Sequence, residues 1–143
     1  STTHEGTVFE EIAFHNNGLY NVGGTGAYPS GNQGVYEISG LLEDSGRFRA
    51  PSLRNIALTA PYMHDGSLET LADVVDHYAR GGTLIEDGPN AGDGKFNPFK
   101  SSLITGFVIS DEEKADLLAF FEALTDETFI TNPAFADPFE GTP

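Results

Sequence analysis

The apolar residues of this chain follow a helical period in two stretches, and both predict helices. The first helix is expected from Ser67 or Leu68 to about Arg80, because the glycine pair at 81–82 gives a clear stop signal. Its apolar residues recur at spacings of three and four, which places them on one face of the helix. They are Leu68, Leu71, Val75 and Tyr78.

The helical period assigns different surroundings to two neighbours, His77 and Tyr78. At roughly 100° per residue, His77 lies about 160° away from Val75 around the helix. We therefore expect His77 to face solvent and Tyr78 to point inward. On periodicity alone, Tyr78 is a core tyrosine whose hydroxyl finds a hydrogen bond.

The second stretch, ISDEEKADLLAFFEALT, carries the strongest helix signals of the chain and predicts a helix from Ser110 to about Thr125. Ser110 and Glu113 have the spacing of a capping box, and the acidic residues between them complement the positive end of the helix dipole. The expected buried face consists of Leu117, Leu118, Phe121 and Leu124.

Glycine, asparagine, serine and proline dominate the segments outside these helices. Residues 20–46 and 83–106 predict long ordered loops, or loops that wrap a partner. Residues 126–143 predict an extended tail that either dangles or lies along a surface. Its candidate anchors are Phe129, Phe135 and Phe139. The whole pattern predicts a mainly α protein with long irregular loops.

Composition narrows the class of partner. The 143 residues suffice for one domain with a moderate core, and they include 17 Gly and 8 Pro. The formal net charge of −15 argues against nucleic acid or an anionic membrane, and it favours a basic protein partner or a bound cation. The chain has no Cys, which excludes disulfides, thiolate metal sites and thioether attachment of haem within it. No apolar run approaches the roughly 18 to 20 residues of a membrane span, so none is expected. We expect no signal peptide in these residues and interpret Ser1 as a cut end.

The stretch RFRAPSLRNIALTAPYMHDGSLETLADVVDHYARGG, residues 47–82, resembles the C-terminal half of the bacterial dihaem cytochrome c peroxidase superfamily. The resemblance is closest to the MauG-like, MbnH-type branch. Supporting matches are FHNNGLYN at 14–21, GAYP at 26–29 and FVISDEEKADLLAFFEALTD at 107–126. Because these matches occur in family order, the resemblance implies a cytochrome c-like C-terminal lobe over residues 1–143.

The resemblance also draws attention to what the chain lacks. Members of the family carry two c-type haems, each attached by a Cys-x-x-Cys-His segment, and neither segment is present here. The second would be expected shortly before FHNNGL, so the chain resembles the C-terminal part of a dihaem enzyme severed just after it. His4 could end such a segment, but Thr3 stands where the second Cys would be, and we interpret His4 as a loop residue.

By resemblance, Tyr78 corresponds to the distal axial ligand of the C-terminal haem. Peroxidases of the family have Met at this position and the MauG-like branch has Tyr. A phenolate is a hard ligand that favours ferric and higher iron states. The core-tyrosine interpretation remains the alternative. Met63, the chain's only Met, is expected to be a packing residue rather than an iron ligand.

Other candidates follow from the same resemblance. His64 corresponds to a haem-pocket residue tied to activation, with a structural histidine as the alternative. Arg49 corresponds to a family arginine near the haem. Arg47 and Arg54 flank it, and such a cluster suits haem propionates, although surface ion pairs are an equal alternative. His15 is expected near the edge of the C-terminal haem, or else it is a structural histidine in an Asn-rich turn.

The resemblance further implies a calcium ion between the two haems. Thr59 and Pro61 correspond to positions whose backbone carbonyls bind this ion, and proline leaves its carbonyl available while it fixes the turn. The remaining ligands would come from the N-terminal lobe and water. The chain alone should therefore bind calcium poorly.

Two functional hypotheses follow. In the first, the chain is part of a peroxide-using dihaem oxidoreductase that oxidises a protein residue or a small electron-transfer protein. Its partner is then the N-terminal haem-bearing part of the enzyme, its location is periplasmic or extracellular, and the fragment alone is inactive. In the second, the chain is a haem-free binding or scaffold module derived from that family. A third, weaker hypothesis is a degradation or assembly product.

Overall fold

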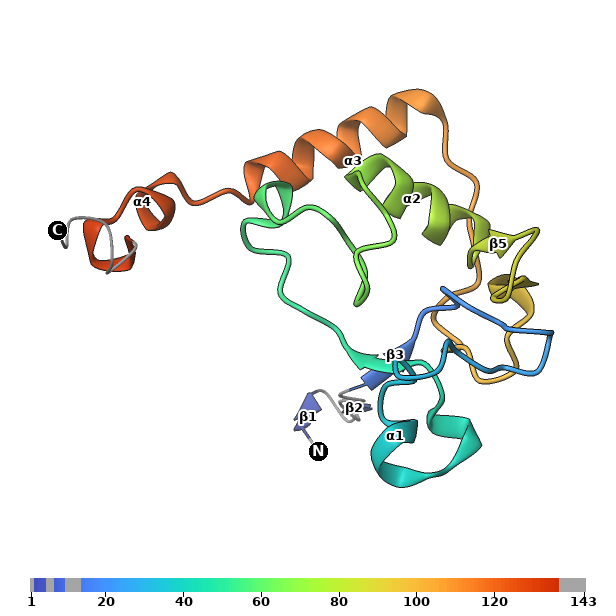
Figure 1. Ribbon diagram of the computed structural model, residues 1–143. Helices are drawn as coiled ribbons and strands as arrows, with labels where there is room; N and C mark the ends of the chain where they lie inside the picture. Colours follow the sequence, from blue (N-terminus) through green and yellow to red (C-terminus); the bar gives the residue numbers. More distant parts are fainter. Residues whose placement is uncertain (1, 5–6, 10–13, 137–143) are drawn as a thin grey trace, which may run out of the picture. The chain divides into compact units, whose positions relative to one another are not determined.

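The computed structural model describes residues 2–4, 7–9 and 14–136. Within them, irregular loops connect short helices and strands (Figure 1). The helices are α1 (Tyr36–Ser39), α2 (Leu71–Arg80), α3 (Asp111–Ala123) and α4 (Glu127–Ile130). The 3₁₀ helices are η1 (Leu42–Asp44), η2 (Ile56–Leu58), η3 (Gly94–Phe96) and η4 (Pro133–Phe135).

Six short strands pair as three antiparallel two-stranded sheets in the described residues. They are β1 (Thr2–His4) with β2 (Thr7–Phe9), β3 (Phe14–Asn16) with β4 (Arg47–Arg49), and β5 (Leu84–Ile85) with β6 (Gly92–Asp93). The mainly α expectation missed these sheets. Strands of two or three residues are too short to show an alternating pattern in the sequence. With these sheets included, the protein is a small mixed α/β fold with long loops.

The helix that carries Tyr78 begins later than predicted. α2 starts at Leu71, because Tyr62 and Leu68 pair through their backbones and hold the intervening residues in a turn. None of the helices in the described residues has the length and hydrophobicity that a membrane span requires.

The prediction for α3 is confirmed at its N-terminus. Ser110 Oγ accepts a hydrogen bond from the Glu113 amide at 3.3 Å, and Glu113 Oε2 accepts one from the Ser110 amide at 2.8 Å. This capping box satisfies two amides that the helix itself leaves unpaired. The predicted apolar face is only half-buried in this chain, at Leu117, Leu118, Phe121 and Leu124.

Residues 126–136 contain α4 and η4, so this part of the expected extended tail is coiled into helical turns. Phe129 and Phe135 pack against each other with ring centroids 4.8 Å apart, and both remain substantially exposed. Phe139 lies outside the described residues.

The chain forms two compact units. The first unit comprises residues 1–51 and 73–109, and the second comprises residues 52–72 and 110–143. The first unit contains the sheets, α1 and most of α2. The second contains η2, α3 and α4.

Buried asparagine side chains hold the loops of the first unit. Asn16, 1% exposed, donates from Nδ2 to the Ser45 carbonyl at 2.7 Å. Its Oδ1 accepts from the Gly18 amide at 2.8 Å and from the Tyr28 hydroxyl at 2.9 Å. The Tyr28 hydroxyl in turn accepts from the Leu19 amide at 3.1 Å. One side chain therefore fixes three separate backbone segments.

Asn21 and Asn97 act in the same way. Asn21 donates to the Asp93 carbonyl at 2.8 Å and accepts from the Gly26 amide at 2.8 Å. Asn97 donates to the Tyr20 carbonyl at 2.8 Å. These amides pair backbone groups that loops cannot pair among themselves, which explains how so irregular a unit stays ordered.

Candidate functional site

Tyr78 lies in the last turn of α2, within the first unit. The residue is half-buried, and its ring packs edge-on against His77 with centroids 4.9 Å apart and an interplanar angle of 83°. Its hydroxyl forms no hydrogen bond with any of the described residues. The hydrogen bond that a core tyrosine would need is therefore absent in this part of the chain, and the hydroxyl is left to a partner outside the described residues.

The prediction that His77 faces solvent is wrong, since His77 is only 5% exposed. Its Nε2 lies 3.1 Å from the Asn17 carbonyl, and its Nδ1 lies 2.7 Å from Thr83 Oγ1. A carbonyl oxygen can only accept, so Nε2 donates and Nδ1 accepts from the Thr83 hydroxyl. The helical wheel failed because loops cover this side of α2 and offer polar partners to the histidine.

The surroundings of His77 keep its ring neutral. Burial lowers the pKa of His77 to about 4, because the charged imidazolium would lose its hydration. The hydrogen bond to the Asn17 carbonyl opposes this effect, and the positive charges of Lys100 and Arg80 add to it. The ring is thus a neutral element of the packing at neutral pH.

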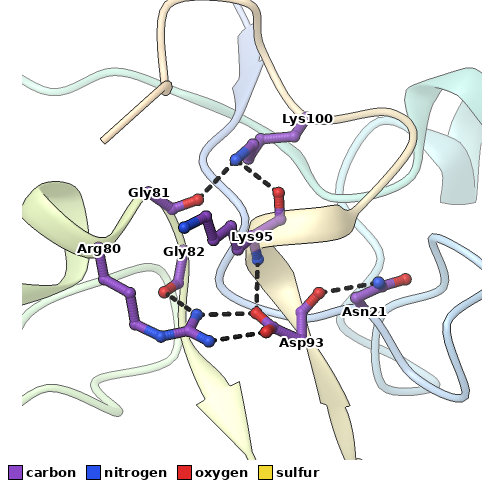
Figure 2. Close-up of polar contacts among 7 residues, drawn as sticks. All are labelled: Asn21, Arg80, Gly81, Gly82, Asp93, Lys95 and Lys100. Carbon is purple, nitrogen blue, oxygen red and sulfur yellow. Dashed lines mark hydrogen bonds and ion pairs between the residues drawn. The ribbon is translucent and has the colours of Figure 1, made fainter. Parts of the chain in front are cut away.

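An ion pair fastens the C-terminal end of α2 (Figure 2). The Arg80 guanidinium donates to both carboxylate oxygens of Asp93, each at 2.7 Å, and also to the Gly82 carbonyl at 2.8 Å. Asp93 additionally accepts from the Lys95 amide at 3.0 Å. These hydrogen bonds lower the pKa of Asp93 and raise that of Arg80. This bidentate ion pair joins the end of α2 to β6.

Lys100 adds a second cation at the same helix end (Figure 2). Its Nζ donates to the Gly81 carbonyl at 2.6 Å and to the Lys95 carbonyl at 2.8 Å. Cationic donors suit the last turn of a helix, where carbonyls lack intrahelical partners and the dipole is negative. The helix end that carries Tyr78 is consequently held by Asp93 of β6 and by Lys100 of the loop after η3.

Three further candidates lie on the β3–β4 sheet of the first unit. In its register His15 is opposite Phe48, while Asn16 is opposite Arg47 and Phe14 is opposite Arg49. Successive side chains of a strand alternate between faces, so Arg47 and Arg49 share one face and His15 lies on the other. Arg47 pairs with Asp44 at 3.0 Å, as the surface ion-pair alternative expects, whereas Arg49 is exposed.

The remaining candidates belong to the second unit. Arg54, Thr59 and Pro61 are exposed. The backbone carbonyls of Thr59 and Pro61 accept no hydrogen bond from the described residues, so both are available to a cation. Their role as calcium ligands stays a prediction.

His64 and Met63 follow Pro61 in the turn before α2. His64 is half-buried, and burial lowers its pKa while the charge of Asp65 opposes this. Met63 is half-buried with a left-handed backbone, φ 71°. Within the described residues, no three His, Asp or Glu side chains cluster as a metal site would require. His4 lies in β1.

Sequence reasoning missed the anchoring of the helix end. No local pattern links Arg80 to Asp93, since an ion pair between distant segments leaves no periodic signal. No local signal marked the burial of His77 either, because its ring bonds to Asn17 and Thr83, which lie outside the helix.

Comparison with known proteins identifies the class of the chain. It is 42% identical over 92 residues to the cytochrome-c peroxidase IdrP1 of Pseudomonas sp. (strain SCT), covering 64% of this chain and 21% of that protein. It is 34% identical over 148 aligned residues to the methylamine utilization protein MauG of Paracoccus denitrificans (strain Pd 1222), covering 87% of this chain and 36% of that protein. No protein-family model matches the chain. The chain belongs to the family of cytochrome-c peroxidases and MauG proteins, and it matches only part of the length of these proteins.

A solved structure narrows the relationship to the MauG-like proteins. The crystal structure of a MauG-like protein associated with microbial copper homeostasis is 55% identical, with a TM-score of 0.86 over 93% of this chain and 38% of that chain. This chain therefore spans less than two fifths of each of these three relatives. The predicted resemblance to a part of a MauG-like protein is confirmed.

Proposed function

We propose that this chain forms the C-terminal part of a MauG-like dihaem c-type cytochrome, an oxidoreductase that uses hydrogen peroxide to oxidise a protein residue or a small electron donor. The observation that carries the proposal is the 55% identity to a MauG-like protein over 93% of the chain. The chain has no Cys, so covalent attachment of haem c would rest on residues outside it.

Tyr78 would bind the iron of the C-terminal haem. Its half-buried phenol, which makes no hydrogen bond within the described residues, and its firmly anchored helix end both suit this role. When bound, the haem supplies the redox chemistry, while the protein sets its ligands and surroundings. A phenolate at Tyr78 would favour ferric and higher iron states over ferrous iron.

The charged residues of the first unit would assist in binding the propionates. Arg49, exposed on the β3–β4 sheet, suits a propionate better than Arg47, because Asp44 already occupies the guanidinium of Arg47. His15 is proposed to lie near the edge of the haem, although its side chain leaves the other face of that sheet. Arg54 and His64 belong to the second unit, and their roles as a propionate-binding and a haem-pocket residue stay predictions from the resemblance alone.

Calcium would bind the carbonyls of Thr59 and Pro61, together with ligands from outside the chain. Main-chain oxygens are suitable ligands for this hard cation. Treatment of the holoprotein with a calcium chelator is expected to lower its Tm, and readdition of calcium should restore it. An unchanged Tm would argue against the site.

The proposed partners are an N-terminal haem-bearing part, and a protein substrate or small electron-transfer protein. The net charge of −15 would favour a basic surface on that second partner. The proposed location is the periplasm or the cell exterior, where c-type cytochromes of this family would act.

The visible absorption spectrum of the native protein that contains this chain tests the proposal. We expect a Soret band that copurifies with the chain and changes when hydrogen peroxide is added. A folded protein without a Soret band would contradict the proposal and support the alternative, a haem-free binding or scaffold module. A Soret band that does not respond to peroxide would contradict the peroxide chemistry alone.

A further inference from the structure

We propose that His77 is a positioning residue for Tyr78, and that its two-point tether fixes the direction in which the Tyr78 ring meets its metal. This inference rests on the proposed function, because it assumes that Tyr78 is a ligand. In this role His77 does not contact the metal directly and acts by packing against Tyr78.

The contact between the two rings is the first support. His77 and Tyr78 pack edge to face, with centroids 4.9 Å apart and planes at 83°. Such T-shaped packing has a preferred geometry and resists rotation of either ring. With His77 fixed, Tyr78 loses freedom on that side of its ring.

The tether of His77 is the second support. One ring nitrogen donates to the Asn17 carbonyl at 3.1 Å, and the other accepts from the Thr83 hydroxyl at 2.7 Å. The Thr83 amide also donates to the Gly18 carbonyl at 3.0 Å, so the two anchor segments are themselves joined. The imidazole therefore has one orientation, since rotation of the ring would break both bonds.

The backbone of His77 is the third support. Its carbonyl accepts from the Gly81 and Gly82 amides, each at 3.0 Å, which closes the last turn of α2. Side chain and backbone of one residue thus hold the turn that carries Tyr78. A ligand fixed before its metal arrives needs less ordering when the bond forms.

The test compares variants of the complete haem-loaded protein by electron paramagnetic resonance of the ferric state, with the Tm and circular dichroism measured alongside. His77→Phe keeps an aromatic ring beside Tyr78 and removes both hydrogen bonds. We expect it to shift or broaden the signal of the tyrosine-ligated haem. Thr83→Val removes one anchor and should give a smaller change of the same kind. His77→Gln, which can both donate and accept, should recover part of the wild-type signal.

A stability control separates positioning from folding. Asp93→Asn weakens the ion pair with Arg80 and should lower the Tm. Among the described residues Asp93 forms no hydrogen bond or ion pair with Tyr78, so the signal should stay at its wild-type position. A wild-type signal in folded His77→Phe would overturn the proposal. If that variant does not fold, an unchanged signal in Thr83→Val would overturn it instead. An equal shift in Asp93→Asn would also overturn it, because any loosening of the helix end would then suffice.

Tyr78→Phe separates failure of this inference from failure of the proposed function. If Tyr78→Phe leaves the haem signal unchanged, Tyr78 is not a ligand and the proposed role of the site is wrong. If Tyr78→Phe abolishes the signal while His77→Phe does not alter it, only the positioning role of His77 is wrong.

Discussion

The two units of this chain differ in what holds them in place. The first unit buries polar side chains, among them Asn16, Asn21 and His77, and each joins loop segments through hydrogen bonds. In the described part of the second unit no side chain is buried, and the apolar face of α3 remains half-exposed. The first unit therefore draws its order from internal polar contacts. The second relies more on local helix signals such as the capping box of α3, and its polar contacts, such as the bond from the Asp126 amide to Asn55, are exposed.

The largest expected effect comes from the buried asparagine of the first unit. Asn16→Ala removes three hydrogen bonds and leaves buried partners unsatisfied, so we expect a loss of about 3 kcal/mol in the free energy of unfolding. The matched truncation in the second unit, Leu118→Ala, removes a half-exposed side chain and should cost about 1 kcal/mol. Denaturant titration measures both. An equal or reversed order of the two losses would contradict a larger contribution of buried polar contacts in the first unit.

The next effect depends on pH and concerns His77. Its pKa is lowered from 6.5 to about 4 in the folded chain, so between these values the unfolded state binds a proton that the folded state does not. Stability should therefore be complete above about pH 6.5 and fall toward pH 4, by up to about 3 kcal/mol.

Denaturant titrations between pH 4 and 7 measure this dependence. His77→Gln has no titrating group at this position, so its stability should change less over the range. An identical pH dependence in wild type and variant would show that His77 is not buried neutral.

A smaller effect on stability is expected at the start of α3, where the capping box of Ser110 and Glu113 lies. Ser110→Ala removes the cap and should cost about 1 kcal/mol. Ser102→Ala is the control, since Ser102 is exposed and makes no hydrogen bond among the described residues. Equal thermal stability of the two variants would contradict the importance of the capping box.

The smallest effect is expected from the ion pair at the end of α2. Arg80 and Asp93 are partly solvent-exposed, with side-chain exposures of 35% and 23%, so solvent screens their attraction. A double-mutant cycle with Arg80→Met and Asp93→Asn should give a coupling of about 0.5 kcal/mol that decreases with added salt. A salt-independent coupling would contradict an ionic contribution.

Local signals in the sequence predicted α3 correctly, because a capping box and its apolar face lie within one helix. They predicted the start of α2 less well, since the Tyr62–Leu68 backbone pairing competes with the helix. They failed for His77, whose partners Asn17 and Thr83 belong to loops. Periodicity could not predict these contacts, because loops that fold back on a helix carry no repeating pattern.

The candidate site shows the same limit. Tyr78 stood out only through resemblance to a family, since a helical stripe does not distinguish a core tyrosine from a ligand. The unbonded hydroxyl and the anchored helix end became visible only in three dimensions. The buried asparagines of the first unit read as turn residues in the sequence, and their role depends on segments far along the chain.

The proposed role of Tyr78 is to bind iron through its phenolate. Resonance Raman spectroscopy of the ferric holoprotein, with excitation in the phenolate-to-iron charge-transfer band, tests it most directly. We expect tyrosinate ring vibrations in the wild type that disappear in Tyr78→Phe and persist in Tyr62→Phe. Their absence from the wild type, or their persistence in Tyr78→Phe, would contradict it.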